Sequence, residues 1–221
     1  MDFERSLTGA LHHRPALGDS SEVAILRFTE QAIGSVERFR GDYEKIFTLP
    51  FNSTNKFSMT VVRNLKTEQI TSLMKGACEA IIKRCSTYYL DHEEKQIDEK
   101  FMEKFHKIYD TIGGYGERII GFCDKQLHSF RNDHKIEFTD PQIPKLGYRF
   151  LGLISFIDPP RATVPSAVQE CRLAGIKVVM ITGDHPITAK AIAKMVNIIS
   201  GETRDEIAKK QSKMSKDVDP S

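Results

Sequence analysis

Residues 176–190, IKVVMITGDHPITAK, carry the clearest fold signal in this sequence. The apolar run at 178–181 is typical of a buried strand, and a polar turn at 182–184 follows it directly. Pro186 then opens a periodic apolar segment, as proline does in the first turn of a helix. The stretch therefore predicts a strand, a loop and a helix in succession.

A loop of this kind is a common place for phosphate chemistry in α/β proteins. The carboxyl end of a parallel strand faces the first turn of the next helix, whose N–H groups lack partners within the helix. Thr182, Gly183 and Asp184 are therefore candidate phosphate-binding residues. The same residues also fit an ordinary turn that binds nothing, so the rest of the chain has to decide between the two.

Composition narrows the class of protein. The chain has 221 residues, enough for one domain and part of another, with 40% hydrophobic and 28% charged residues. Because 32 basic residues face 30 acidic ones, the basic excess of a nucleic-acid-binding protein is missing and we expect no nucleic-acid partner. No stretch approaches the roughly 18 apolar residues of a membrane-spanning helix, and no signal peptide is visible.

The cysteines argue against a metal centre or a disulfide framework. None of them forms a C-x-x-C pair, and reduced thiols are the expected state. The four are Cys78, Cys85, Cys123 and Cys171.

The first two thirds of the chain predict helices together with an antiparallel sheet. A helix is expected over residues 19–34, where the first turn, D-S-S-E, is spaced like a capping box. Three extended runs at short spacing then indicate a meander rather than a βαβ repeat. They are residues 46–49, 57–62 and 70–74.

Further elements follow up to residue 157. We expect helices at 79–85 and 99–112, a charged connection at 91–100, strands at 119–123 and 148–157, and a polar surface loop at 129–147. After the turn at 158–161, the pattern changes to helices at 164–174 and 186–199 around the strand at 178–181. Two architectures, both within the α/β class, therefore meet at this turn.

Five motifs in this order carry a resemblance to a known family. They are FNSTNK at 51–56, MKGA at 74–77, GERIIGFC at 116–123, DPPR at 158–161 and TGDHPITAKAIA at 182–193. The chain resembles the catalytic subunit of a P-type ATPase, in particular the sodium/potassium and proton/potassium pump α-subunits. FNSTNK is typical of that branch rather than of calcium pumps, and the resemblance covers roughly residues 15–200.

The resemblance implies a division into domains. Residues 1–155 would form the nucleotide-binding (N) domain, an α+β fold with an antiparallel sheet that lacks its first strands here. Residues 156–200 would form part of a haloacid-dehalogenase-like phosphorylation (P) domain, and 201–221 a charged, disordered tail. Because the family's N domain is inserted in its P domain, the turn at 158–161 would be a hinge.

The resemblance implies that four residues of the first domain take part in nucleotide binding. Phe51 would stack on the adenine ring, because a flat aromatic face suits a flat heterocycle. Glu22 would accept a hydrogen bond from the adenine amino group, and Arg118 would pair with phosphate in a bidentate way. Cys123 matches a position in the pocket wall. Without the resemblance, Phe51 is better explained as a core residue, and Cys123 equally well as a buried strand residue.

At the phosphate end, Lys56 and Lys75 would supply point charges, and Gly76 would let the backbone approach the ligand. Lone lysines are usually solvated, so this assignment depends on the flanking motifs.

In the partial P domain, the resemblance implies that Thr182, Gly183 and Asp184 meet the γ-phosphate and its Mg²⁺. Asp158 would lie close to the same centre, although an Asp before two prolines also fits a simple turn.

Two departures from the family pattern are expected to weaken nucleotide binding. Residues 78–80 read Cys-Glu-Ala where the family commonly has Pro-Glu-Arg, and Ser58 replaces a Gln that lies near the base in related pumps.

The sequence also lacks the D-K-T-G-T motif with the phosphoryl-acceptor Asp and the later T-G-D-G-x-N-D segment. An aspartyl-phosphate requires a carboxylate nucleophile and a metal that offsets charge, so no catalytic set is complete and no protein metal site is expected. By the resemblance, the parent pump couples ATP hydrolysis to Na⁺/K⁺ or H⁺/K⁺ transport, with a β-subunit, at the cytoplasmic side of the plasma membrane. This chain is expected to be a soluble cytosolic fragment that binds ATP with its Mg²⁺ and does not hydrolyse it.

Two other functions stay open on the sequence. The chain could be a stand-alone, non-catalytic decoy or scaffold that contacts a pump or a cytoskeletal partner. A soluble phosphatase of the haloacid-dehalogenase type is the weakest alternative, because its nucleophile is missing.

Overall fold

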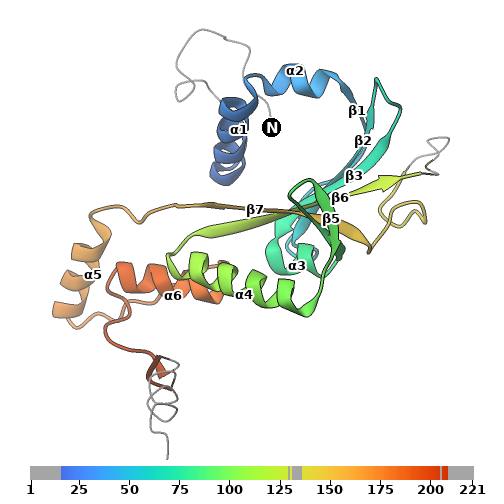
Figure 1. The fold of residues 1–221 in the computed structure, drawn as a ribbon. Helices are drawn as coiled ribbons and strands as arrows, with labels where there is room; N and C mark the ends of the chain where they lie inside the picture. Colours follow the sequence, from blue (N-terminus) through green and yellow to red (C-terminus); the bar gives the residue numbers. More distant parts are fainter. Residues whose placement is uncertain (1–15, 129, 131–135, 205, 209–221) are drawn as a thin grey trace, which may run out of the picture. The chain divides into compact units, whose positions relative to one another are not determined.

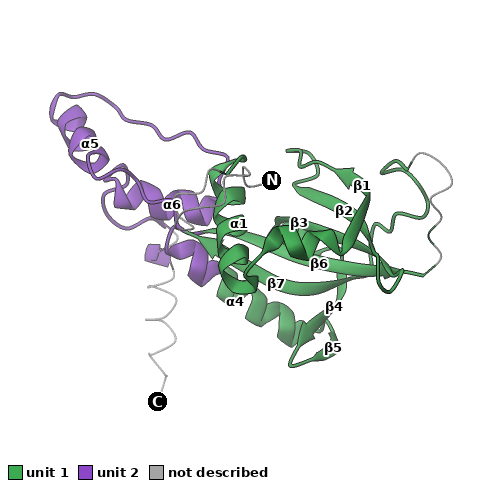
Figure 2. Ribbon diagram, turned by 90° about the horizontal axis from the view of Figure 1, so that it is seen from above, with its two compact units in different colours: residues 1–109, 118–156 green, residues 110–117, 157–221 purple. Residues whose placement is uncertain are grey.

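The computed structural model describes residues 16–128, 130, 136–204 and 206–208. The chain divides into two compact units, shown in different colours in Figure 2. Unit 1 consists of residues 1–109 and 118–156, and unit 2 consists of residues 110–117 and 157–221. Most of the expected charged tail lies outside the described residues, as do residues 1–15.

Unit 1 is built around a seven-stranded sheet in the order β1-β2-β3-β6-β7-β4-β5 (Figure 1). Every neighbouring pair is antiparallel except β4 and β7, which are parallel. The strands are β1 (Tyr43–Leu49), β2 (Phe57–Asn64), β3 (Ile70–Ala77), β4 (Cys85–Leu90), β5 (Glu93–Gln96), β6 (Arg118–Leu127) and β7 (Tyr148–Phe156). The predicted mixed α/β fold is confirmed, and so is the antiparallel meander of β1, β2 and β3.

Six helices have bounds within the described residues. They are α1 (Ser20–Ile33), α2 (Val36–Gly41), α3 (Cys78–Ile82), α4 (Glu99–Gly114), α5 (Val164–Leu173) and α6 (Pro186–Met195). The expected helix at the start of the chain is confirmed as α1: Asp19 caps it by accepting from the backbone N–H groups of Ser21 and Glu22 at 2.9 and 3.0 Å. Gly34 ends it with a φ of 83°, a conformation that glycine adopts easily.

Alternation along the strands separates the two faces of the sheet. Phe57, Met59 and Val61 of β2 are buried, whereas the residues between Phe57 and Val61 point to the other face. The buried face forms the core of unit 1 with Ile81 of α3 and Phe105 of α4. Figure 1 shows α3 and α4 on one side of the sheet and α1 on the other. The face opposite the core is therefore the one that α1 approaches.

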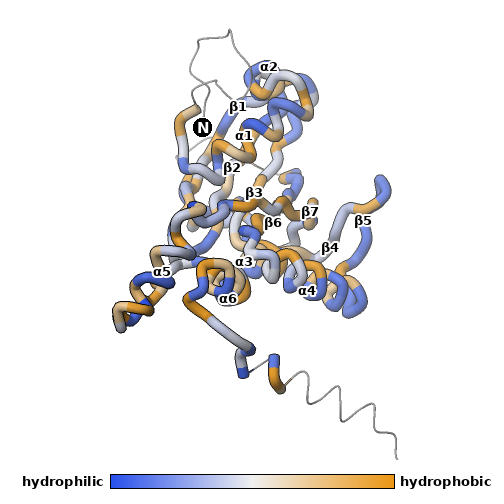
Figure 3. The backbone as a smooth tube through the Cα atoms, turned by 90° about the vertical axis from the view of Figure 1, so that its left-hand side faces the viewer, coloured by the Kyte–Doolittle hydropathy of each residue, from blue (hydrophilic) through white to orange (hydrophobic). Residues whose placement is uncertain are grey.

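Three elements of unit 1 were not predicted: α2 and the β4–β5 hairpin. The two residues that connect the hairpin, Asp91 and His92, both have positive φ, which the sequence signals less clearly than Asn-Gly would. β5 is hydrophilic (Figure 3), so its sequence lacks the alternation that marks a strand. Charge on an edge strand discourages pairing with other chains, so β5 is protected where it ends the sheet.

The expected polar surface loop at 129–147 is wrong in part. Its described portion contains no helix or strand, but Ile136 and Ile143 are buried in the core of unit 1. The segment therefore contributes apolar side chains to the fold that a reading by average polarity misses.

Unit 2 corrects the opening prediction of a strand at 178–181. This run belongs to no strand, and Ile181 is 95% exposed. A strand is stabilised by hydrogen bonds to neighbouring strands, and the described residues of unit 2 include none. The helix expected at 186–199 is present as α6 but ends at Met195.

Candidate functional site

A hollow lies on the sheet face opposite the core, across β2, β3, β6 and β7. Its volume is about 280 Å³, close to the lower end of small-molecule sites. Strand alternation places one hydroxyl-bearing pair, one lysine and three large apolar side chains toward it, while Met74 and Cys123 contribute from the buried layer. The lining residues are Ser58, Thr60, Leu73, Met74, Lys75, Phe122, Cys123 and Leu151.

Lys75 is the positively charged residue that lines this hollow, and its ion-pair partner lies on α1. The Lys75 Nζ donates a hydrogen bond to Glu22 Oε2, so two predicted ligand-binding residues, 53 positions apart in sequence, form an ion pair. Their side chains are 31% and 28% exposed. The carboxylate of Glu22 is therefore paired with a cation of the sheet rather than fully solvated.

Lys56 ends the polar turn between β1 and β2. Asn52 shapes this turn, because its Oδ1 accepts from Asn55 N at 2.7 Å and its carbonyl accepts from Lys56 N at 2.9 Å. Lys56 has a φ of 59°, and its Nζ lies 3.7 Å from Glu79 Oε1. Its carbonyl accepts from Ala77 N at 2.9 Å, so the turn is fixed beside the end of β3.

The close packing of the backbone around position 76 explains why this residue is a glycine. A Cβ at this position would lie 2.3 Å from the Lys56 carbonyl oxygen and 2.6 Å from Phe57 Cα. Any side chain would therefore separate β3 from the start of β2. The glycine is required by the approach of protein backbone, and its predicted contact with a ligand stays a prediction.

Phe51 lies two residues beyond the end of β1 and is 62% exposed, so it is not a core residue. It does not line the hollow; the aromatic ring that does is Phe122 of β6, beside Leu151 of β7. Sequence reasoning missed both apolar residues. A signal was available for Phe122, because it alternates with the buried Cys123 along β6.

Cys123 and Arg118 both lie on β6. Cys123 is 1% exposed, and its hydrogen bond with Cys85, together with burial, raises the pKa of the Cys123 thiol. It is therefore a neutral core residue that also borders the hollow. Arg118 begins the strand, is half-buried, and stands opposite Phe156 of β7.

The residues predicted to meet the γ-phosphate all belong to unit 2. Thr182 Oγ1 donates to Asp184 Oδ2 at 2.9 Å and accepts from Asp184 N at 3.1 Å, which closes a compact turn before α6. His185 caps α6, and Asp158 is an exposed residue just beyond β7. The adenine-end residues, in contrast, belong to unit 1.

The described residues contain no group of three or more His, Cys, Asp or Glu side chains that could hold a metal ion. Mg²⁺ commonly binds through substrate phosphates and one or two carboxylates. Asp158 and Asp184 are the carboxylates predicted to meet the Mg²⁺ of bound ATP, and this role stays a prediction.

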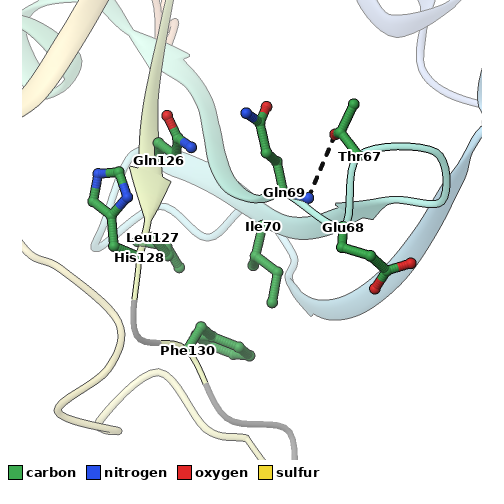
Figure 4. Close-up of a pocket in the computed structure, with 8 residues that line it drawn as sticks. All are labelled: Thr67, Glu68, Gln69, Ile70, Gln126, Leu127, His128 and Phe130. Carbon is green, nitrogen blue, oxygen red and sulfur yellow. Dashed lines mark hydrogen bonds between the residues drawn. The ribbon is translucent and has the colours of Figure 1, made fainter.

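A second hollow of about 300 Å³ lies at the other end of β3 and β6 (Figure 4). It is lined by Thr67, Glu68, Gln69, Ile70, Gln126, Leu127, His128 and Phe130. Figure 4 shows polar side chains around the paired strand ends of Ile70 and Leu127, with Gln69 N donating to Thr67 Oγ1 at 3.5 Å. None of the residues singled out from the sequence lies there.

Residues 5–163 match the family model described as P-type ATPase, cytoplasmic domain N, and the chain belongs to this family. Within the described residues, no helix is long and apolar enough to cross a membrane.

The chain is similar to whole pump subunits from animals. It is 46% identical to the sodium/potassium-transporting ATPase subunit alpha-A of Artemia franciscana, over 94% of this chain and 22% of that protein. It is 48% identical to the sodium/potassium-transporting ATPase subunit alpha of Drosophila melanogaster, over 92% of this chain and 20% of that protein. The potassium-transporting ATPase alpha chain 2 of Rattus norvegicus is 44% identical over 90% of this chain and 20% of its own length. The chain thus spans about a fifth of the length of these relatives.

Proposed function

We propose that this chain binds ATP at the hollow of unit 1, as the nucleotide-binding part of a sodium/potassium pump α-subunit. The observation that carries the proposal is the position of Lys75, which lies in a hollow that also offers the apolar surfaces of Phe122 and Leu151. A purine needs apolar contact and a phosphate chain needs a cation, and both are present on one sheet face.

Most of the predicted ligand-binding residues have a role in this proposal. The exposed ring of Phe51 stacks on adenine, and Glu22 accepts from its amino group. Lys75 and Lys56 neutralise phosphate charge; Lys56 is well placed because its turn is hydrogen-bonded to the end of β3. Arg118 adds a bidentate donor at the start of β6. Thr182, Gly183, Asp184 and Asp158 act on the γ-phosphate with its Mg²⁺ in the whole protein.

The activity of the whole protein is also a proposal. A pump of this family would form an aspartyl-phosphate and move Na⁺ and K⁺ across the plasma membrane, with a β-subunit as its partner. The present sequence has no D-K-T-G-T motif, so it has no phosphoryl acceptor of that kind. We therefore propose that this chain alone binds ATP without hydrolysing it, through an N domain within residues 1–155 followed by part of a P domain at 156–200.

A titration with ATP, followed by NMR of the backbone amides, tests the proposal. We expect perturbed signals along β2, β3 and β6, and a loss of affinity of about five- to 150-fold in Phe51→Ala, because stacking on a base contributes about 1–3 kcal/mol. Phe39→Ala is the matched control, since Phe39 is similarly exposed but lies in α2. Equal affinity in Phe51→Ala and the unaltered chain, or no binding at all, would contradict the proposal.

The absence of chemistry is tested separately with γ-labelled ATP. We expect no acid-stable phosphoprotein and no release of inorganic phosphate above the background rate. Phosphatase turnover that disappears in Asp184→Ala would instead favour the haloacid-dehalogenase alternative.

A further inference from the structure

The carboxylate of Glu22, a residue of the same chain, neutralises the positive charge that Lys75 brings to the hollow. We infer that Glu22 is an internal competitor for anionic ligands at Lys75, so that the site rejects bare polyphosphate and favours ligands that also offer a hydrogen-bond donor. The inference rests on the proposed function, because it concerns the ligand selectivity of the same hollow.

The pair is better shielded from solvent than an exposed ion pair of unit 1, Lys66 and Asp42, and about as shielded as Arg149 and Asp124. Both side chains are about seven-tenths screened from solvent, whereas Lys66 and Asp42, 2.8 Å apart, are 71% and 44% exposed. Lower exposure to water strengthens the attraction between the two charges. An anion that approaches Lys75 must therefore overcome a stronger ion pair than it would at a fully exposed lysine.

The origin of the two residues also matters. Lys75 is fixed on β3, where it stands opposite Ser58 of β2, whose hydroxyl donates to the Lys75 carbonyl at 3.5 Å. Glu22 lies in the first turn of α1, a helix in which the buried residues are Leu26 and Glu30. The carboxylate of Glu30 is directed to Val36 N at 2.7 Å, at the start of α2. The hydrogen bond that Lys75 donates to Glu22 therefore connects the first turn of α1 to the sheet.

The chemical consequence follows from charge balance. A bare polyphosphate can reach Lys75 only by displacing Glu22, which leaves a half-buried carboxylate without its cation and close to a second anion. A ligand that carries a donor group besides its phosphates can satisfy Glu22 while its anion takes Lys75. Glu22 therefore penalises the first kind of ligand more than the second.

The test uses the full chain, with tripolyphosphate and ATP as probes, in parallel titrations at constant ionic strength. In Glu22→Gln, we expect the affinity for tripolyphosphate to rise about fivefold, because a half-screened ion pair contributes on the order of the upper limit for exposed pairs. The affinity for ATP should rise less or fall, since the lost acceptor offsets the freed lysine. Lys75→Met should weaken tripolyphosphate binding in both backgrounds.

Asp42→Asn is the matched control. It removes the same unit of charge from an ion pair at the opposite end of β2, so it should leave both affinities unchanged. If Glu22→Gln perturbs the fold in the amide spectrum, Glu22→Asp gives the same readout, because its shorter side chain keeps the charge but loses the reach to Lys75.

The outcomes are separable. Unchanged or weaker tripolyphosphate binding in both Glu22 variants overturns the inference, as does a fivefold rise that Asp42→Asn reproduces. A rise confined to the Glu22 variants supports it. Failure of the proposed function has a different signature, because ATP would then not bind the unaltered chain or would ignore Phe51→Ala, whatever tripolyphosphate does.

Discussion

Two apolar runs of this chain, β7 and residues 178–181, have opposite fates. β7 pairs with β6 along its length and with β4 at its start, and its first residue, Tyr148, is fully buried. Residues 178–181, VVMI, are at least as apolar but join no strand, and Ile181 is almost completely exposed. Apolar composition and β-propensity are present in both. The difference lies in whether neighbouring strands are within reach, because strand formation is a property of a sheet rather than of a segment.

The largest expected effect would sharpen the contrast between the two units. Ile81 of α3 is fully buried in the core of unit 1. Ile81→Ala should lower the free energy of unfolding by about 2–5 kcal/mol, because it removes apolar contact and leaves a cavity. Urea unfolding followed by circular dichroism measures this loss.

Ile176→Ala is the control, since Ile176 of unit 2 is 57% exposed and should cost little. A comparable loss in both variants would show that the two units do not differ in packing as described.

The next effect concerns the buried start of β7. The hydroxyl of Tyr148 donates to the Pro144 carbonyl at 3.0 Å and shares a 2.9 Å hydrogen bond with Ser72 Oγ. Burial raises the pKa of Tyr148 to about 12. The phenol of the unfolded chain titrates near 10, so the folded state is favoured fully below about pH 10 and loses stability as pH rises toward 12, by up to about 1.4 kcal/mol per pH unit.

Urea unfolding between pH 9 and 12 tests this effect, with Tyr148→Phe expected to reduce the slope. Part of the slope should remain, because burial also raises the pKa of Cys78 to about 12. Tyr115→Phe, at an exposed position of unit 2, should leave the slope unaltered. An identical slope in Tyr148→Phe and the unaltered chain would exclude Tyr148 as its source.

The same contrast explains what could be predicted from sequence. The positions of β2, β3 and β6 followed from apolar runs bounded by turns, and Lys75 and Gly76 followed from a motif. β5 could not be predicted, because a strand of Glu, Lys and Gln is stabilised by its pairing with β4. The bond between Glu22 and Lys75 was also out of reach, since it joins residues far apart in sequence through the fold. The prediction of a strand at residues 178–181 failed for the opposite reason. These residues have the apolar pattern of a strand, but the described part of unit 2 contains no strand with which they could pair.

The smallest expected effect tests whether strand formation depends on apolar composition or on the presence of partner strands. Ile181→Thr keeps the β-branched shape and removes only apolar surface, which is already in water at this position. We therefore expect the free energy of unfolding to change by less than about 0.5 kcal/mol, as for ordinary surface substitutions. The same segment buried in a sheet would lose about 1.5–3 kcal/mol, the worth of a buried isoleucine. Thermal unfolding of the two chains distinguishes these values. A loss in the larger range would mean that residues 178–181 do pack in solution. A neutral result would mean that a run with full strand propensity stays outside a sheet when the described part of its unit offers no strand to pair with it.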